Sequence, residues 1–271
     1  MKLTILGSGV CSNNYFDQDL QLDQRYPPAY LLEFEDNKML FECSELVRFR
    51  LEQSGFNYAD IQHLAISHAH PDHFALVHYI QSVYCRGLWG ETKNETLNIY
   101  CPEQIEEGFE QYWRYHLPEM EAGERYDWPE LKFGQIYNQD KTIGDAKLSS
   151  YPVYHGFGRA DSVGFRLETE DSIFGYSGDT GVCVGVKKIA SSADLFLCEA
   201  SVSSEYVEDA KDYGHLTPPQ VGEIADKGSV KHLVVTHYPG TDKPDKIVEE
   251  IRKAGFEGQL DIAGDFDEYT F

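Results

Sequence analysis

The residues best suited to chemistry form the cluster His68-Ala69-His70-Pro71-Asp72-His73, in which four side chains could bind metal. Neutral imidazole and carboxylate are ligands that zinc and similar divalent metals take. In an extended chain, positions 68 and 70 can converge on one ion, and Asp72 and His73 then face a second ion after a turn. The alternative is a solvated polar loop, which would explain one histidine better than it explains this cluster. The cluster therefore predicts a site for two metal ions.

Two ions need further ligands, and three later residues share a suitable context. His155, Asp179 and His237 each stand just past an apolar run of strand length. The ends of neighbouring strands form a rim that can hold a site. Taken singly, His155 or His237 could be an ordinary loop histidine. Together with the cluster, the three residues predict the rest of the metal site.

The elements that would position these residues follow from apolar patterning. We expect helices from an N-cap at Ser44 to Gly55, from within the histidine cluster onward, after Pro102, and over 218–226 and 245–254. We expect strands over 2–6, 29–34, 38–42, 63–67, 96–100, 147–154, 162–169, 172–176, 194–199, 232–236 and 259–262. Two strand-rich portions with helices between and after them predict two sheets packed face to face with helices outside. No linker or repeat divides the chain, so we expect one domain over residues 1–271.

Length, composition and charge exclude several classes of protein. The chain has 271 residues, 41% of them hydrophobic, which is too apolar for a disordered chain. No run approaches the ~18 apolar residues of a membrane helix, and the N-terminal apolar run is too short for a signal peptide, so we expect a cytoplasmic protein without membrane contact. The net charge of −23 argues against nucleic-acid binding by the general surface. Six cysteines without a Cys-x-x-Cys pair predict buried, reduced thiols.

From Leu6-Gly7-Ser8-Gly9 through the histidine cluster to His237, the chain resembles the metallo-β-lactamase-fold hydrolases, and within them the ribonuclease Z-like branch. The resemblance implies a four-layer αββα sandwich. It also implies two divalent cations, zinc first, with manganese and iron as alternatives. In the family pattern, one metal would be held by His68, His70 and His155, the other by Asp72, His73 and His237, and Asp179 would bridge the two.

Two further motifs resemble the same branch. Cys198-Glu199-Ala200-Ser201 is similar to its Glu-Ala-Thr segment, and Gly214-His215-Leu216-Thr217 is similar to its later His-x-Thr segment. A carboxylate that orients an imidazole and raises its pKa prepares it to donate a proton to a leaving oxygen. The alternative for His215 is the flank of a helix capped by Thr217. We therefore expect Asp72, Glu199 and His215 to serve catalysis.

These features predict a metal-dependent hydrolase that cleaves a small anionic phosphodiester, such as a cyclic nucleotide, a nucleotide-derived diester or a short oligonucleotide. Two metals would lower the pKa of bound water and supply hydroxide as nucleophile, with His215 as proton donor. One alternative is a lactone, thioester or carboxylic ester hydrolase of the same fold. Another, from a different class, is a metal-binding regulatory protein without turnover.

Departures from the ribonuclease Z pattern argue against transfer RNA as a partner. The Gly/Pro- and Lys-rich arm of those enzymes has no counterpart here, and Phe-Ser-x-Arg does not follow His237. The resemblance also implies a homodimer. An aromatic segment over 109–116 has two interpretations: Tyr112, Trp113 and Tyr115 could stack on a nucleobase, or the segment could pack a helix, which we favour.

Overall fold

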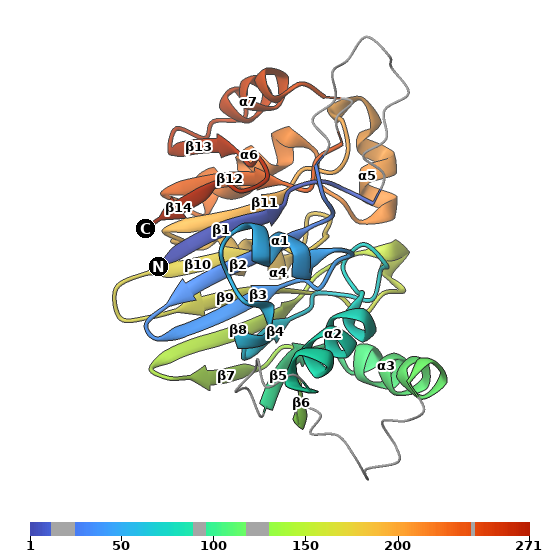
Figure 1. The fold of residues 1–271 in the computed structure, drawn as a ribbon. Coiled ribbons are helices and arrows are strands. Elements are labelled where there is room, and N and C mark those ends of the chain that lie inside the picture. The colour runs from blue at the N-terminus through green and yellow to red at the C-terminus, as the bar shows by residue number, and fades with distance from the viewer. Residues whose placement is uncertain (12–24, 89–95, 118–129, 240–241) are drawn as a thin grey trace.

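The computed structural model describes residues 1–11, 25–88, 96–117, 130–239 and 242–271, and Figure 1 shows two facing sheets with helices on their outer sides. The first sheet has the strand order β14-β1-β2-β3-β4-β5-β6. Its strands are β1 (Lys2–Gly7), β2 (Ala29–Phe34), β3 (Asn37–Phe41), β4 (His63–Ala65), β5 (Thr96–Cys101), β6 (Glu130–Gln135) and β14 (Glu268–Thr270). The strands from β3 to β6 run parallel to one another.

The second sheet has the order β13-β12-β11-β10-β9-β8-β7. Its strands are β7 (Asp140–Ile143), β8 (Ala146–Pro152), β9 (Val163–Glu168), β10 (Ile173–Tyr176), β11 (Leu195–Glu199), β12 (His232–Thr236) and β13 (Gln259–Ile262). The strands from β7 to β10 pair antiparallel, and those from β10 to β13 pair parallel. Parallel neighbours end at the same edge of a sheet, so the loops after β10, β11 and β12 lie together.

Helices cover the outer face of each sheet. The first sheet carries α1 (Val47–Gln53), α2 (Leu76–Leu88) and α3 (Glu103–His116), and the second carries α4 (Val184–Ala190), α6 (Pro218–Lys227) and α7 (Pro244–Lys253). The connections contain α5 (Val207–Tyr213) and the short 3₁₀ helices η1 (Tyr58–Asp60), η3 (Gly156–Gly158) and η4 (Ser204–Tyr206). No described helix is long and apolar enough to cross a membrane. The predicted four-layer αββα sandwich is confirmed.

Aromatic and aliphatic side chains together fill the space between the two sheets. Phe41 of the first sheet contacts Phe165, Phe174 and Tyr176 of the second, with ring centroids 5.3–5.8 Å apart. Edge-on and tilted contacts of this kind stabilise a core beyond the area that they bury. These contacts hold the two sheets, and with them the strand ends around the site, against each other.

Two predicted helix starts are wrong in position. The α1 helix begins at Val47 after Leu46, whose φ of 64° breaks the helix, and the Ser44 hydroxyl instead donates to the carbonyl of Pro27. The second helix, α2, begins only at Leu76, so the whole histidine cluster lies in the loop before it. Thr217 is the N-cap of α6 and forms a capping box with Gln220, so the helix flank considered as the alternative for His215 is present beside the predicted pair.

The remaining differences concern short elements. The sequence patterning did not predict β6, β7, β14, α4 or α5. In the aromatic segment, Phe109 is buried in the core and Trp113 packs against it, as the packing interpretation predicts, whereas Tyr112 and Tyr115 are exposed. All six cysteines are unpaired thiols, and Cys43, Cys101 and Cys198 are buried.

Candidate metal centre

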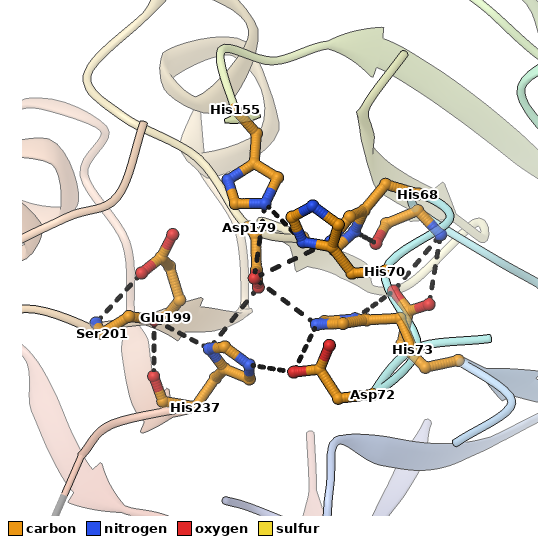
Figure 2. A network of polar contacts seen from close by, with 12 residues as sticks. His68, His70, Asp72, His73, His155, Asp179, Glu199, Ser201 and His237 are labelled. Atoms are coloured by element: carbon orange, nitrogen blue, oxygen red, sulfur yellow. Dashed lines mark hydrogen bonds and ion pairs between the residues drawn. The ribbon is translucent and has the colours of Figure 1, made fainter. Parts of the chain in front are cut away.

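The predicted metal ligands meet at one end of the sandwich, although they come from distant parts of the sequence. Each follows the C-terminal end of a strand, as expected: His68 follows β4, His155 follows β8, Asp179 follows β10 and His237 follows β12. Figure 2 shows their side chains directed toward one another around Asp179.

The two predicted ligand groups are both assembled. The ligand atoms of His68, His70 and His155 lie within 4.8 Å of one another, and the same holds for Asp72, His73 and His237. Within the first group, Nε2 of His155 lies 3.1 Å from Nδ1 of His70. Within the second, Oδ2 of Asp72 lies 3.7 Å from Nε2 of His73.

Asp179 lies between the two groups. Its Oδ2 is 3.4 Å from Nε2 of His73 and 3.9 Å from Nε2 of both His68 and His155. Its Oδ1 is 3.5 Å from Nδ1 of His237. One carboxylate thus faces ligand atoms of both groups, which is the position that a bridging ligand would take.

The donor set fits divalent cations. Several ligand atoms are buried without a hydrogen-bond partner, namely Nε2 of His68, Nε2 of His73, Nε2 of His237 and Oδ1 of Asp179. Buried polar atoms are ordinarily paired, so unpaired ones that converge need a partner. Ligands at 2.0–2.2 Å from a tetrahedral zinc ion stand roughly 3.3 Å apart, close to the spacings found here.

The protonation of the first ligand group and of Asp179 suits metal binding. Burial lowers the pKa of His68 well below its ordinary value, and burial likewise lowers the pKa of His70 and His155. Burial opposes the charge on Asp179, but the neighbouring His237 and His73 outweigh it and hold the pKa of Asp179 well below its usual range. Neutral imidazole and ionised carboxylate are the forms that bind metal. For His73, burial opposes the charged form, but Asp179 and Glu42 outweigh burial and raise its pKa well above the ordinary value.

Hydrogen bonds from surrounding groups orient the histidines. The hydroxyl of Ser67 lies 2.9 Å from Nδ1 of His68, and Nδ1 of His155 lies 3.0 Å from the carbonyl oxygen of Gly214. These contacts occupy Nδ1 and leave Nε2 directed at the centre. Partners of this kind fix the tautomer and orientation of a metal-binding histidine.

His237 is oriented by Ser201. The Ser201 hydroxyl donates to the His237 carbonyl at 2.8 Å, so its oxygen can accept from Nδ1 of His237 at 2.7 Å. Nε2 of His237 is thereby left toward Asp72, 3.6 Å away. The φ of His237 is 45°, a strained value that places the ring at the end of β12.

The predicted pair of Glu199 and His215 is present beside the metal groups. Nδ1 of His215 lies 3.0 Å from Oε1 of Glu199, and the ligand atoms of His215, His155 and Asp179 lie within 4.8 Å of one another. Glu199 accepts further hydrogen bonds from the backbone NH groups of Thr180, at 2.6 Å, and Ser201, at 3.0 Å. The carboxylate is therefore held in one orientation.

Glu199 raises the basicity of the His215 imidazole. Burial disfavours the charged form of His215, but the adjacent Glu199 carboxylate outweighs burial and raises the pKa of His215 to about 9. His215 is then protonated at neutral pH. A protonated imidazole next to the metal groups can donate a proton to an oxygen that leaves there.

Sequence reasoning did not identify Glu42, which supports the centre from the first sheet. Glu42 is fully buried, has a φ of 64°, and its Oε1 lies 3.6 Å from Nδ1 of His73. It accepts hydrogen bonds from the backbone NH of Ser67 at 3.2 and 3.3 Å. A charged residue closing an apolar strand was a signal for it. Ser67, next to His68, carried no distinctive pattern, and Ser201 was part of the Glu199 motif but was given no role.

The chain is similar to known proteins in sequence and in fold. Residues 40–238 match the family model described as the beta-lactamase superfamily domain. A ribonuclease Z of Streptomyces avermitilis is 26% identical over 276 residues, which cover 88% of this chain and 89% of the relative.

Two solved structures share the fold over their whole length. The short form of human tRNase Z superposes with a TM-score of 0.75 at 19% identity, covering 100% of this chain and 99% of the other. A diphosphatase from the PhnP family superposes with a TM-score of 0.73 at 16% identity, covering 100% and 97%.

Proposed function

The chain belongs to the beta-lactamase superfamily and is a metal-dependent hydrolase, and we propose that it hydrolyses a small anionic phosphodiester at a dinuclear centre. In this proposal, His68, His70 and His155 hold one divalent cation. Asp72, His73 and His237 hold the other, and Asp179 bridges them. Zinc is the first candidate for both positions, because imidazole and carboxylate suit it.

The observation that carries the proposal is the contact between Glu199 and His215, 3.0 Å apart at the edge of the ligand cluster. Hydrolysis of a phosphodiester expels an alkoxide, which needs a proton as the bond to phosphorus breaks. His215 is placed to supply that proton from Nε2 while Glu199 holds Nδ1. Hydrolysis of a carboxylic ester or lactone proceeds by attack at carbon. That reaction depends less on a proton donor for the leaving oxygen.

Cations bound at this centre would activate water and stabilise negative charge on a phosphoryl oxygen. The chain's part is orientation. Ser67, Ser201 and the carbonyl of Gly214 hold three of the histidines by Nδ1, and the backbone NH groups of Thr180 and Ser201 hold Glu199. Groups fixed in this way need little rearrangement during the reaction.

Charge favours a small substrate. Asp72 and Asp179 would contribute two negative charges to a centre that holds two divalent cations, so the centre is locally positive. The molecule as a whole carries a net charge of −23. A long polyanion is repelled by that acidic surface along its length. A small diester interacts mainly with the centre, because salt screens charges farther away than ~8 Å.

Cleavage of transfer RNA is the second candidate, favoured by the names of the similar ribonuclease Z and tRNase Z chains. Phosphate contacts by lysine and arginine supply most of the affinity for RNA, and the chain has only 23 such residues against 46 acids. We therefore expect transfer RNA to bind weakly.

A substrate panel with metal analysis tests the proposal. Zinc- and manganese-loaded protein is assayed with bis-p-nitrophenyl phosphate, a cyclic nucleotide, a dinucleotide, a lactone and a thioester. We expect turnover of phosphodiesters and none above background with the others. Ready turnover of the lactone or thioester without phosphodiester cleavage would contradict the proposal. Tight, salt-sensitive binding and cleavage of transfer RNA would favour the second candidate.

A further inference from the structure

An aromatic residue in a strained conformation lies beside the centre. Phe157, two residues after His155, has a φ of 58° and ψ of 26°, flanked by Gly156 and Gly158 with φ of 59° and 69°. Left-handed backbone is disfavoured for a bulky residue and is retained mainly where it has a use. The side chain is 53% exposed, so the strain does not bring it into the core.

Tyr213 forms the second half of the same surface. It ends α5, is 52% exposed, and its ring centroid lies 4.5 Å from that of Phe157 with 47° between the planes. Both rings therefore keep free surface toward solvent while they contact each other.

The two rings stand on the side of the proton donor. Tyr213 precedes His215 by two residues as Phe157 follows His155 by two, and the rings of His155 and His215 lie 4.8 Å apart. The hydrogen bond between Nδ1 of His155 and the Gly214 carbonyl joins the two segments directly. A group leaving toward His215 would therefore leave toward Phe157 and Tyr213.

A depression of about 780 Å³ adjoins this surface at Tyr213 and reaches Ser201 beside the centre. Ser201, which contacts His237, is one of its lining residues, and Tyr206 and Tyr213 are two others. Its charged lining residues are Glu205, Asp209, Asp242, Lys243 and Lys246. Lys246 is paired with Asp242 at 2.9 Å and Glu205 at 3.4 Å. Acids outnumber bases here, so a further phosphate would be poorly accommodated, whereas an uncharged ring suits the tyrosines.

We propose that Phe157 and Tyr213 form a stacking surface for an uncharged planar ring, such as a nucleobase, on the leaving-group side of the phosphodiester. The inference rests on the proposed function and names the substrate class more narrowly, as a nucleotide-derived diester. Bases stack on exposed aromatic side chains without regard to their sequence, because each base has a π face. The volume of the depression is in the range typical of small-molecule sites.

The test compares two ligands that differ only in the base. Adenosine 5′-monophosphate and ribose 5-phosphate are titrated calorimetrically into the zinc-loaded protein. We expect the nucleotide to bind about tenfold more tightly, as stacking on aromatic side chains implies. Phe157→Asn removes the ring, and asparagine adopts the left-handed backbone conformation of this position readily. In this variant the preference for adenosine 5′-monophosphate over ribose 5-phosphate should fall below about threefold. The zinc content and the affinity for ribose 5-phosphate should not change.

Control variants make the result specific. Phe157→Tyr keeps a ring and should keep the preference, as should Tyr112→Asn, which removes an exposed tyrosine from α3. Equal binding of the two ligands by the parent protein would overturn the inference, as would an equal loss for both in Phe157→Asn. Sedimentation showing that Phe157→Asn separates a dimer while the base preference stays would make the surface a self-contact instead. Turnover of bis-p-nitrophenyl phosphate is scored separately, so a failure of the proposed function is recognised independently of the titrations.

Discussion

The carboxylate of Asp265 accepts two hydrogen bonds from Ser8 on one oxygen, from the backbone NH and the hydroxyl, each 2.9 Å long. Its other oxygen accepts from the backbone NH of Tyr26 at 2.9 Å and from Arg50 at 2.8 Å. The carbonyl of Ser8 in turn accepts from the backbone NH of His237 at 2.9 Å. Asp265 thus holds the turn after β1 against the segment that carries a proposed metal ligand.

Asp265→Asn is expected to weaken both the fold and the centre. The side chains of Asp265 and Arg50 are 13% and 7% exposed, and burial lowers the pKa of Arg50 while the charge of Asp265 opposes this change. Loss of a hydrogen-bonded charge there should cost about 2 kcal/mol of unfolding free energy. Zinc affinity should fall as His237 loosens. Urea unfolding and zinc titration measure the two effects.

The matched control for this variant is Asp140→Asn. Asp140 pairs with Lys147 at 2.8 Å, but both side chains are more than half exposed, and such pairs contribute little. We expect no measurable change. If Asp265→Asn also unfolds at the parent's urea concentration with the parent's zinc affinity, the network has no positioning role.

His215→Gln is expected to lower turnover in a way that depends on the leaving group. For a diester with an alkoxide leaving group, kcat should fall by about 10²–10⁴, the usual contribution of a general acid. For bis-p-nitrophenyl phosphate the loss should be much smaller, because its leaving group is weakly basic. Zinc content, by elemental analysis, should remain that of the parent.

Glu199→Gln serves as the companion variant, since it keeps the shape of the side chain but removes the charge that orients His215. We expect kcat to fall with the same dependence on the leaving group, but by a smaller factor than in His215→Gln. Equal losses for both substrates in His215→Gln, or loss of bound zinc, would assign His215 to the centre's structure and not to proton transfer.

Gly214→Ala is expected to damage the junction between the two histidine-bearing segments. Gly214 has a φ of 83°, and a Cβ there would lie 2.5 Å from the carbonyl oxygen of Tyr154 and 2.6 Å from Cα of His155. The left-handed conformation alone costs roughly 1–2 kcal/mol for a residue with a Cβ. Turnover should fall at least about tenfold, because small displacements of catalytic groups are costly.

Gly108→Ala is the control for this substitution. A Cβ at Gly108 meets nothing within 4 Å, and the residue lies inside α3, where alanine is favoured by about 1 kcal/mol. We expect slight stabilisation and unchanged turnover. An active, fully stable Gly214→Ala protein would show that the loop can shift without consequence.

The metal cluster was predictable because its information is local. His68, His70, Asp72 and His73 stand within one short segment. The strands β8, β10 and β12 run in the same direction, so their C-terminal ends bring His155, Asp179 and His237 to the same edge. Neither step requires knowledge of side-chain packing. The assignment of these residues to two metals stays a prediction, as does the single-domain description.

The start of α1 was not predictable from local patterning. Ser44 has the residue type of an N-cap, but the chain turns through left-handed conformations at Glu42 and Leu46 before the helix begins. Glu42 is fixed there by burial next to His73, a contact between separate segments. Tertiary demands of this kind override local preference.

The short edge and connecting elements were not predictable from sequence patterning for a related reason. The β14 strand has three residues and, among the described strands, pairs with β1 alone, and of the seven residues of α5 only Ala210 is buried. Elements that bury so little leave no clear apolar period in the sequence. Their placement depends on the sheets that they join.

The cysteines provide a test of the core. Burial raises the pKa of Cys101 to about 12 and that of Cys43 still higher, and burial also raises the pKa of Cys198. Since the thiolate is the reactive form, these thiols should resist iodoacetamide at pH 8. Cys11 is exposed and should react first, slowed by the raised pKa that burial and the charge of Asp72 give it. Peptide mass spectrometry measures the order, and labelling of Cys43 or Cys101 before unfolding would contradict it.

The aromatic segment in α3 is expected to stabilise the fold through one residue. Phe109 is 1% exposed, and its ring centroid lies 5.4 Å from that of Phe133, whereas Tyr115 is 81% exposed. Phe109→Ala should lower the free energy of unfolding by about 3–5 kcal/mol, because it removes a large buried ring. Tyr115→Ala should change it by less than about 0.5 kcal/mol. Urea unfolding measures both effects.

Turnover tests the packing interpretation separately. The kcat/KM of Tyr115→Ala on a dinucleotide should equal that of the parent protein. A loss of dinucleotide turnover in Tyr115→Ala with unchanged stability would show that the helix contacts substrate, contrary to the packing interpretation.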